Sequence, residues 1–301
     1  MKKVLAIALL CAVSSFATWD YFPAKDAGNG EVKVGFGYYI NPEGQKNYSI
    51  LGATADARYS IIDGLEIALF TQFPLSASVP DKTQEDASMS CKAEGEHVCP
   101  PTYGPPVIGV RYWLPMGLGI ALDVALPKQG DAYPTGGHKK EAKYNTHLDF
   151  IPALQFSTNL APELSFGSQV SLTIPGETKD EKGDKEKAGM DLGIGVEFDY
   201  STGSVTPYLG VDIAMGLTPR KVNGEVPKDK ATKTEEEAKK TGIDVGVGAT
   251  FTINDNMSAD VGLICGFGGR YEATTYDKKT GFPSTENITP LTIQAHFSYN
   301  F

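Results

Sequence analysis

The sequence predicts an all-β protein that forms a single closed antiparallel transmembrane β-barrel of about twelve strands. Three observations predict this fold. Apolar and polar residues alternate with a period of two along most of the chain, short and long connections follow each other between the alternating stretches, and the apolar face carries no charged residue.

The first 17 residues have the composition of a secretory signal peptide. Met1-Lys2-Lys3 is basic, residues 4–13 are apolar, and small residues precede Thr18. We therefore expect export, cleavage after Ala17, and one mature domain over residues 18–301. The segment from Trp19 to Pro23 is predicted to lie either at the periplasmic interface or inside the barrel.

Twelve stretches carry the period-two pattern. In residues 31–40, Val32, Val34 and Phe36 share one face, whereas Lys33 lies on the other. The same alternation recurs near residues 47–60, 65–76, 106–114, 118–127, 143–157, 163–174, 190–200, 205–218, 241–253, 258–270 and 288–301. Each stretch is long enough to form a strand that borders an apolar medium on one side only.

The connections between these stretches differ systematically in length. Short turns are expected at residues 61–64, 115–117, 159–162, 201–204 and 254–257. Long polar loops are expected at residues 77–105, 128–142, 175–189, 219–240 and 271–287, and the connection over residues 41–46 is a short exception. Short turns at one end, long loops at the other and an even strand number are typical of bacterial outer-membrane barrels.

The two faces of the predicted strands differ in charge. A Lys or Arg facing lipid near the midplane costs about 2–4 kcal/mol, and no outward position carries one. The opposite face holds Gly, Ser, Thr, Gln and charged residues, so we expect it to line a polar lumen. The lumen-facing candidates are Lys33, Asp56, Arg58, Glu66, Arg111, Asp123, His147, Asp149, Asp191, Glu197, Asp199, Asp212, Asp244, Asp260 and His296.

Carboxylates outnumber bases among these candidates, and this imbalance leads to the main functional hypothesis. An acidic wall concentrates cations and repels anions, which favours a pore for passive or facilitated diffusion of small cationic or neutral solutes. The alternative is that the carboxylates solvate the interior or pair with Arg58 and Arg111. The protein would then be a non-conducting structural or surface-interaction barrel that acts through its outer loops.

A third hypothesis is an outer-membrane hydrolase. His147 shares a face with Asp149 and, together with Asp123, would form an acid and base cluster. His296 likewise shares a face with the hydroxyl of Ser298. Both spacings are common in strands and neither supplies a complete set of catalytic groups, so we assign no catalytic residue and expect no enzymatic activity.

Three cysteines remain after signal cleavage. Cys91 and Cys99 lie close together in a polar stretch, and in an oxidising compartment they are expected to form a loop disulfide. The alternative is zinc bound by Cys91, His97 and Cys99, for which no fourth ligand is evident. Cys265 lies within an apolar alternation and is expected to act as a small hydrophobic residue. We expect no cofactor and no metal.

The last strand carries a resemblance to a known family. Its outward residues include Phe297, Tyr299 and Phe301, and the chain ends on the last of these. This pattern resembles the terminal signal by which the barrel assembly machinery recognises Gram-negative outer-membrane β-barrel proteins. Within that class, strand count and length resemble the transporter-like barrels of the meta pathway of phenol degradation.

The resemblance implies residence in the cell outer membrane. The implied partners are membrane lipid and lipopolysaccharide, the assembly machinery acting on the last strand, and a small solute in the lumen. The mature chain is acidic, with 37 Asp and Glu against 27 Lys and Arg over the full sequence. We therefore expect no nucleic-acid partner.

Overall fold

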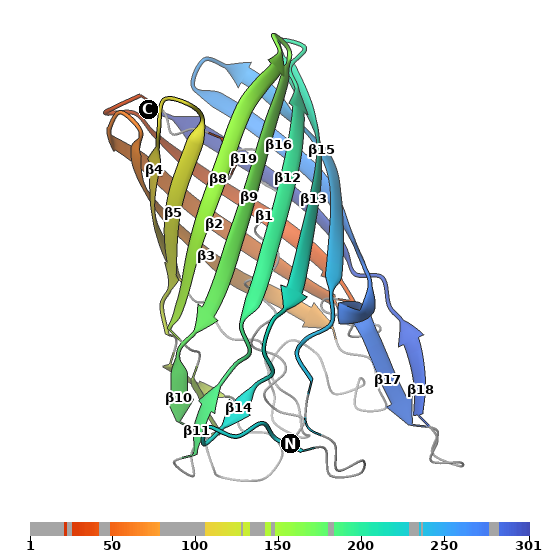
Figure 1. The fold of residues 1–301 in the computed structure, drawn as a ribbon. Coiled ribbons are helices and arrows are strands. Elements are labelled where there is room, and N and C mark those ends of the chain that lie inside the picture. The colour runs from red at the N-terminus through yellow and green to blue at the C-terminus, as the bar shows by residue number, and fades with distance from the viewer. Residues whose placement is uncertain are drawn as a thin grey trace.

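The computed structural model describes residues 21–22, 26–41, 49–78, 106–127, 129–132, 142–145, 148–179, 184–228, 235, 237–276 and 283–301. Twelve strands form one closed barrel in which each strand pairs with the next barrel strand in the sequence and the last pairs with the first (Figure 1). They are β1 (Gly30–Ile40), β2 (Ser49–Ile62), β3 (Leu65–Ser78), β4 (Val107–Trp113), β5 (Leu118–Ala125), β8 (Asp149–Ala161), β9 (Leu164–Pro175), β12 (Asp191–Tyr200), β13 (Val205–Gly216), β15 (Gly242–Asn254), β16 (Met257–Phe267) and β19 (Leu291–Asn300). The predicted antiparallel barrel is confirmed.

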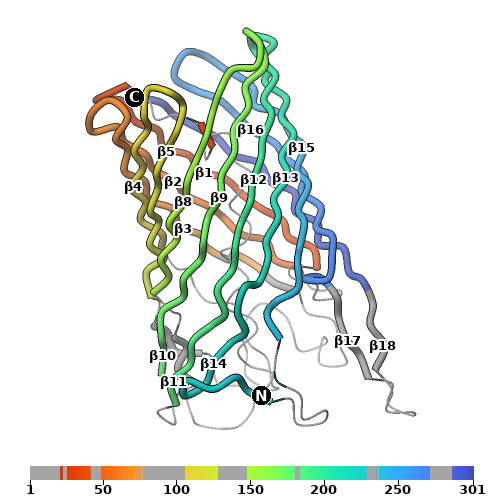
Figure 2. The backbone as a smooth tube through the Cα atoms, viewed as in Figure 1, coloured from red at the N-terminus to blue at the C-terminus, as the bar shows by residue number. Residues whose placement is uncertain are grey.

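Pairing of the first and last strands closes the barrel. β1 runs antiparallel to β19, with Val34 opposite Phe297 and Tyr38 opposite Ile293. Gly30 and Phe301 exchange backbone hydrogen bonds of 2.8 and 3.0 Å at the end of this seam. The strands are tilted and curve around a common axis, as the backbone tube shows (Figure 2).

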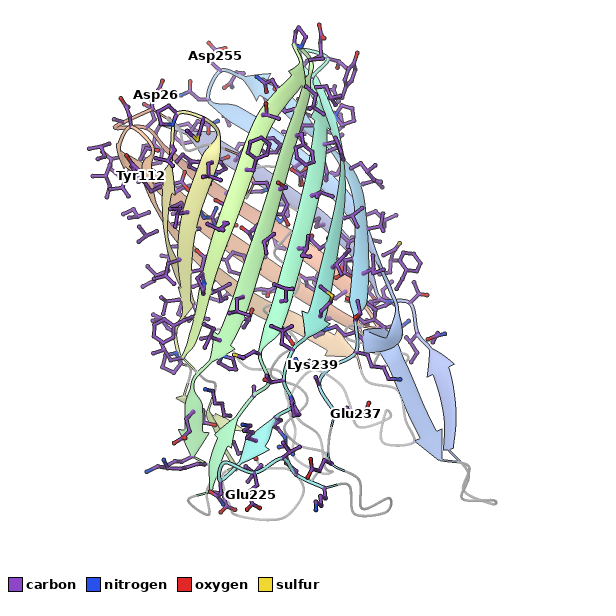
Figure 3. The ribbon with its side chains drawn as sticks, viewed as in Figure 1. Asp26, Tyr112, Glu225, Glu237, Lys239 and Asp255 are labelled. Carbon is purple, nitrogen blue, oxygen red and sulfur yellow. The ribbon has the colours of Figure 1, made fainter. Side chains whose placement is uncertain are left out.

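The two ends of the barrel are built differently, as the sequence predicts. Tight turns join consecutive strands at the upper end of Figure 1, where the C-terminus also lies. The turn between β2 and β3 uses Asp63 and Gly64, and Gly64 has a φ of +79°, a value that glycine adopts without steric cost. Asp26 and Asp255 lie at this end, whereas Glu225, Glu237 and Lys239 lie at the opposite end (Figure 3).

Short strands extend the connections at the long-loop end. β10 (Glu177–Lys179), β11 (Lys185–Lys187) and β14 (Lys221–Val222) form a three-stranded sheet, while β6 (Gln129–Ala132) pairs with β7 (Ala142–Asn145) and β17 (Glu272–Tyr276) pairs with β18 (Pro283–Asn287). Lys185 donates a hydrogen bond to Glu177 over 2.8 Å, and this carboxylate raises the pKa of the exposed ammonium group. In the described part of the chain, no helix has the length and apolarity needed to cross a membrane.

Burial alternates along the barrel strands in step with the sequence pattern. On β1, Val32, Val34, Phe36 and Tyr38 are exposed, whereas Lys33 and Tyr39 are buried. Exposed apolar residues follow the same parity on the other barrel strands, and Tyr112 points away from the barrel in Figure 3. Six of the aromatic residues nearest the strand ends are exposed on this outer face: Tyr59, Phe73, Tyr112, Phe156, Tyr200 and Phe267. The outer surface is therefore suited to lipid.

Candidate functional site

The inner face of the barrel is the candidate site because most charged residues of the barrel strands lie on that face. The described sequence candidates occupy the strand positions opposite the exposed apolar residues. His147 lies outside the described residues, as do the expected signal peptide, Cys91 and Cys99. The expected disulfide and its zinc alternative therefore stay predictions. Among the residues that the structure describes, no group of three or more His, Cys, Asp or Glu residues is arranged to hold a metal ion.

On β1 to β5, each base has a carboxylate on the neighbouring strand. Arg58 on β2 contacts Glu66 on β3 through Nε and Nη2, both 2.7 Å from Oε1. Arg58 is 6% exposed and Glu66 is 1% exposed, so this ion pair is almost fully removed from solvent. Such a pair is stable only when both members are present, because either charge alone would be buried without compensation.

The same arrangement recurs on both sides of this pair. Arg111 on β4 reaches Asp123 on β5, with Nη2 and Oδ2 3.6 Å apart. Lys33 on β1 lies opposite Asp56 on β2 in the strand register and is 4% exposed. Three bases and three carboxylates therefore alternate around this part of the wall, and a fourth carboxylate, Glu31 on β1, lies opposite Arg58 in the register.

The wall formed by β12, β13, β15 and β16 has a different composition. These four strands carry six inward carboxylates, namely Asp191, Glu197, Asp199, Asp212, Asp244 and Asp260, but contain no Lys or Arg. Glu197 has no exposed surface at all. The structure thus divides nine of the ten predicted carboxylates into two groups, of which only the group on β2, β3 and β5 lies beside the lumen bases of β1, β2 and β4. The tenth, Asp149, begins β8 and lies opposite Ala125 in the register.

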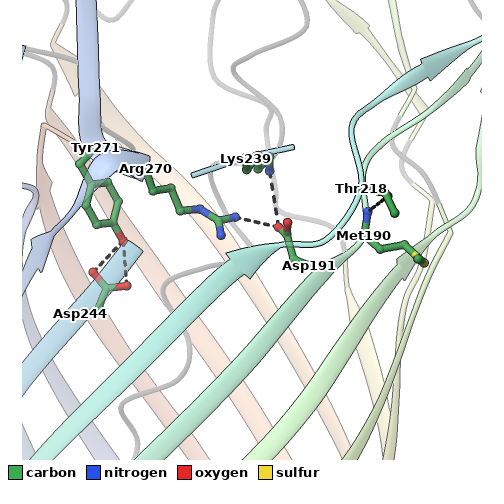
Figure 4. Close-up of polar contacts among 7 residues, drawn as sticks. All are labelled: Met190, Asp191, Thr218, Lys239, Asp244, Arg270 and Tyr271. Carbon is green, nitrogen blue, oxygen red and sulfur yellow. Dashed lines mark hydrogen bonds and ion pairs between the residues drawn. The ribbon is translucent and has the colours of Figure 1, made fainter. Parts of the chain in front are cut away.

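Several partners of the second group come from outside these four strands. Tyr21 donates a hydrogen bond to Asp212 Oδ1 over 2.6 Å. Tyr271 approaches both oxygens of Asp244, at 2.7 and 2.8 Å. Arg270 reaches Asp191, and this contact lies beside the pair formed by Tyr271 and Asp244 at the long-loop end (Figure 4).

Tyr21 places the start of the described chain inside the barrel. Its side chain is 1% exposed. A Cβ atom added to Gly167 on β9 would lie 2.6 Å from Tyr21 Cβ, and one added to Gly195 on β12 would overlap the Tyr21 hydroxyl. Of the two positions predicted for this segment, the structure places Tyr21 in the lumen, against wall positions that have no side chain.

Other inward rings also lie over glycines. Tyr39 covers Gly37, where an added Cβ would meet the ring at 2.5 to 3.0 Å, and its hydroxyl accepts a 2.6 Å hydrogen bond from Gln72. Tyr208 covers Gly262 from a neighbouring part of the wall. The inward glycines therefore provide the space that allows rings to lie flat against the barrel.

His296 has a carboxylate partner that the sequence did not identify. Its Nδ1 lies 3.2 Å from Asp260 Oδ1 on the neighbouring strand, and Thr250 donates to the other oxygen of Asp260 at 3.5 Å. Within the described residues, the structure records no hydrogen bond between His296 and Ser298. The arrangement therefore orients a histidine without joining it to a nucleophile.

The proposed assembly residues lie on the lipid-facing side of β19. Phe297, Tyr299 and Phe301 are exposed, and the rings of Tyr299 and Phe301 stack with centroids 6.5 Å apart. Cys265 is a free thiol on the outer face of β16, opposite Leu291 in the register. This position agrees with the apolar role expected for it.

Comparison with known proteins supports the same fold. Residues 110–301, well over half of the chain, match the family model described as "Outer membrane protein beta-barrel domain". The chain belongs to this family. Membership implies location in the outer membrane and agrees with the terminal pattern of β19. No curated protein matches the sequence.

Two solved structures resemble this chain over most of its length. An outer-membrane channel from Pseudomonas putida F1 has a TM-score of 0.61 at 11% identity, covering 95% of this chain and 99% of that one. The NanC porin has a TM-score of 0.50 at 8% identity, covering 89% of this chain and 98% of the porin. At these identities the comparison concerns the fold, and the resemblance to transporter-like barrels is confirmed at that level.

Proposed function

We propose that this protein is an outer-membrane channel for small cationic or neutral solutes, with Tyr21 occupying part of its lumen. The observation that carries the proposal is the wall of β12, β13, β15 and β16. Its six carboxylates have no basic partner on those strands, and the glycines opposite Tyr21 leave space that the wall itself does not fill.

Electrostatics supports the proposed preference for cations. The balanced pairs of β1 to β5 contribute little net field, because each base has a carboxylate next to it. Most of the excess negative charge therefore comes from the part of the wall formed by β12, β13, β15 and β16. A solute with a positive group would be stabilised along that part, whereas an anion would be repelled by it.

The N-terminal segment supports a channel whose opening depends on this peptide. Tyr21 is not part of the barrel ladder, so its displacement requires no strand to separate. Its described hydrogen bond is made to Asp212, one of the carboxylates that we propose to interact with the solute. A cation that binds Asp212 would compete directly with the Tyr21 hydroxyl.

The experiment is single-channel conductance and reversal potential of the refolded mature protein in a planar bilayer under a salt gradient. The expected result is a steady conductance that favours cations. Asp212→Asn and Glu197→Gln should reduce the cation preference, whereas Asp255→Asn, at the tight turn between β15 and β16, removes the same charge outside the lumen and should not.

A non-conducting barrel is the second candidate, supported by the low exposure of inner side chains such as Glu66 and Gln155, each at 1%. A correctly folded protein that conducts no ions, even without residues 18–25, would favour it. The hydrolase hypothesis has weaker support, because His296 is joined to Asp260 and not to Ser298. The proposed partners are lipopolysaccharide at the outer loops and the barrel assembly machinery at Phe297, Tyr299 and Phe301.

A further inference from the structure

Three of the long connections converge on one carboxylate at the mouth of the barrel. Asp191 directly follows the connection between β9 and β12. Its Oδ2 lies 2.8 Å from Arg270 Nη2, and Arg270 belongs to the short 3₁₀ helix η3 (Gly269–Tyr271) that begins the connection between β16 and β19. The same oxygen lies 3.8 Å from the Nζ atom of Lys239, near the end of the connection between β13 and β15 (Figure 4).

Backbone hydrogen bonds hold the bases of these connections close to Asp191. Leu217 donates to the Met190 carbonyl over 2.8 Å, and Gly216 donates to the Lys239 carbonyl over 3.2 Å. The Met190 amide in turn donates to Thr218 Oγ1 over 2.9 Å. Main-chain contacts thus join the first two connections, and the third is joined to them by the Arg270 side chain and by a hydrogen bond from its backbone amide to the Thr241 carbonyl.

The path of Arg270 depends on small residues in the strands beneath it. The side chain starts just after β16 and lies against Gly242 of β15, and its end contacts Asp191 of β12, which is separated from β15 by β13. A Cβ atom added to Gly242 would lie 2.9 Å from Arg270 Cδ and 3.3 Å from Tyr271 Cε2. The Arg270 amide also donates to the Thr241 carbonyl over 3.1 Å, which fixes the start of the side chain.

Tyr271, next to Arg270 in η3, is firmly held, whereas the guanidinium group of Arg270 is held by a single contact. Tyr271 is 7% exposed and bonds to both oxygens of Asp244. Arg270 contacts Asp191 through only one nitrogen and one oxygen, and its Nη1 and Asp191 Oδ1 make no hydrogen bond with any described residue. A single contact lacks the geometric restraint of the two parallel bonds that Arg and a carboxylate often form.

We propose that Asp191 and Arg270 form a releasable latch that holds three outer connections together over the mouth of the barrel. Releasing the Arg270 side chain removes the contact between the connection after β16 and Asp191. That connection is then held only by the bond from the Arg270 amide to Thr241 and by Tyr271, which remains bound to Asp244 as the pivot. Lys239 contributes less than Arg270, because its side chain is 47% exposed and its contact is long. The role of the latch in admitting solute rests on the proposed channel function.

Hydrogen–deuterium exchange of the full mature protein in lipid nanodiscs tests the latch directly. Asp191→Asn and Arg270→Gln should each speed exchange of the Arg270, Leu217 and Gly216 amides by roughly ten- to hundredfold, the range expected for losing a hydrogen bond to a charged group. The double variant should exchange no faster than the faster single variant, because both substitutions break the same contact.

Glu177→Gln is the matched control, since it removes one carboxylate from the exposed pair with Lys185 and leaves Asp191 intact. It should leave the three amides unchanged. Arg270 lies outside the barrel strands, so Arg270→Gln tests the latch even where Asp191→Asn impairs folding. Unchanged exchange in Arg270→Gln, or equal acceleration in Glu177→Gln, would overturn the proposal.

Conductance of the same variants separates the latch from the proposed function. Faster exchange with a higher open probability supports both. Faster exchange in a barrel that remains non-conducting supports the latch and counts against the channel. Unchanged exchange rejects the latch whatever the conductance.

Discussion

Tyr21 and Asp212 are joined by a 2.6 Å hydrogen bond across 191 positions of sequence. One partner precedes the first barrel strand and the other lies in the middle of β13. The bond therefore connects a segment outside the barrel ladder to the wall whose carboxylates have no basic partner on their own strands.

Tyr21→Phe is expected to loosen this segment without altering the barrel. A hydrogen bond to a charged group contributes about 1.5–3 kcal/mol, so the segment should leave the wall roughly ten to a hundred times more often. Single-channel recordings should show more frequent or longer openings. Tyr38→Phe makes the same chemical change on the exposed face of β1 and serves as the control. Equal behaviour of the two variants would contradict a gating role for Tyr21.

Glu66→Ala is expected to destabilise the barrel by about 3–5 kcal/mol, because Arg58 would remain buried without its partner. Urea unfolding in detergent or lipid vesicles, followed by tryptophan fluorescence, measures the loss. Replacing both Arg58 and Glu66 by Met should recover most of the stability, since no unpaired charge remains. A double variant as unstable as Glu66→Ala would show that the ion pair is not the cause.

Gly37→Ala is expected to cost about 1–3 kcal/mol, because the new methyl group would overlap Tyr39, whose hydroxyl is held by Gln72. The test is a double-mutant cycle with Tyr39→Ala, read out by the same unfolding measurement. The glycine substitution should cost less when the ring is absent. An equal cost in both backgrounds would assign the effect of Gly37→Ala to the backbone instead of the ring.

Phe301→Ala is expected to lower the amount of folded protein in the outer membrane severalfold, because it removes the last residue of the proposed assembly signal. Cell fractionation and heat-dependent gel mobility measure this amount. Phe267→Ala removes another exposed outer aromatic ring, which lies at the long-loop end of β16, far from Phe301. It should have a smaller effect. Normal assembly of Phe301→Ala would reject the signal.

The barrel was predictable because each strand borders two different media. Lipid on one side excludes charge, as at Val32, Val34 and Phe36, and the polar interior accepts Lys33 on the other. This contrast repeats in every barrel strand and fixes the face of each residue. The β7 and β8 region departs from the prediction. One strand was expected over residues 143–157, whereas the barrel strand begins at Asp149 and runs to Ala161.

The sequence predicted which side chains point inward better than it predicted which of them contact each other. Alternation places Arg58 and Glu66 on the inner face, but their contact depends on the register between β2 and β3. Tyr21 lies outside the alternating stretches, and Arg270 is the last residue of the stretch over residues 258–270, so the alternation does not mark their contacts. The carboxylate partner of His296 likewise depends on β16 and β19 being neighbours. Glycine at positions 37 and 195 was visible in the sequence, but which ring would cover each position was not.

The carboxylates in the two parts of the barrel wall differ in where their partners come from. A hairpin such as that of β2 and β3 enters the bilayer with Arg58 and Glu66 already able to neutralise each other. The β12 to β16 region depends instead on groups from outside its strands, including Tyr21 and Arg270. We therefore expect Asp212 and Asp191 to gain these two partners only after the strands have inserted into the membrane. We expect an arrested assembly intermediate to expose this part of the wall with a larger uncompensated negative charge than the part formed by β1 to β5.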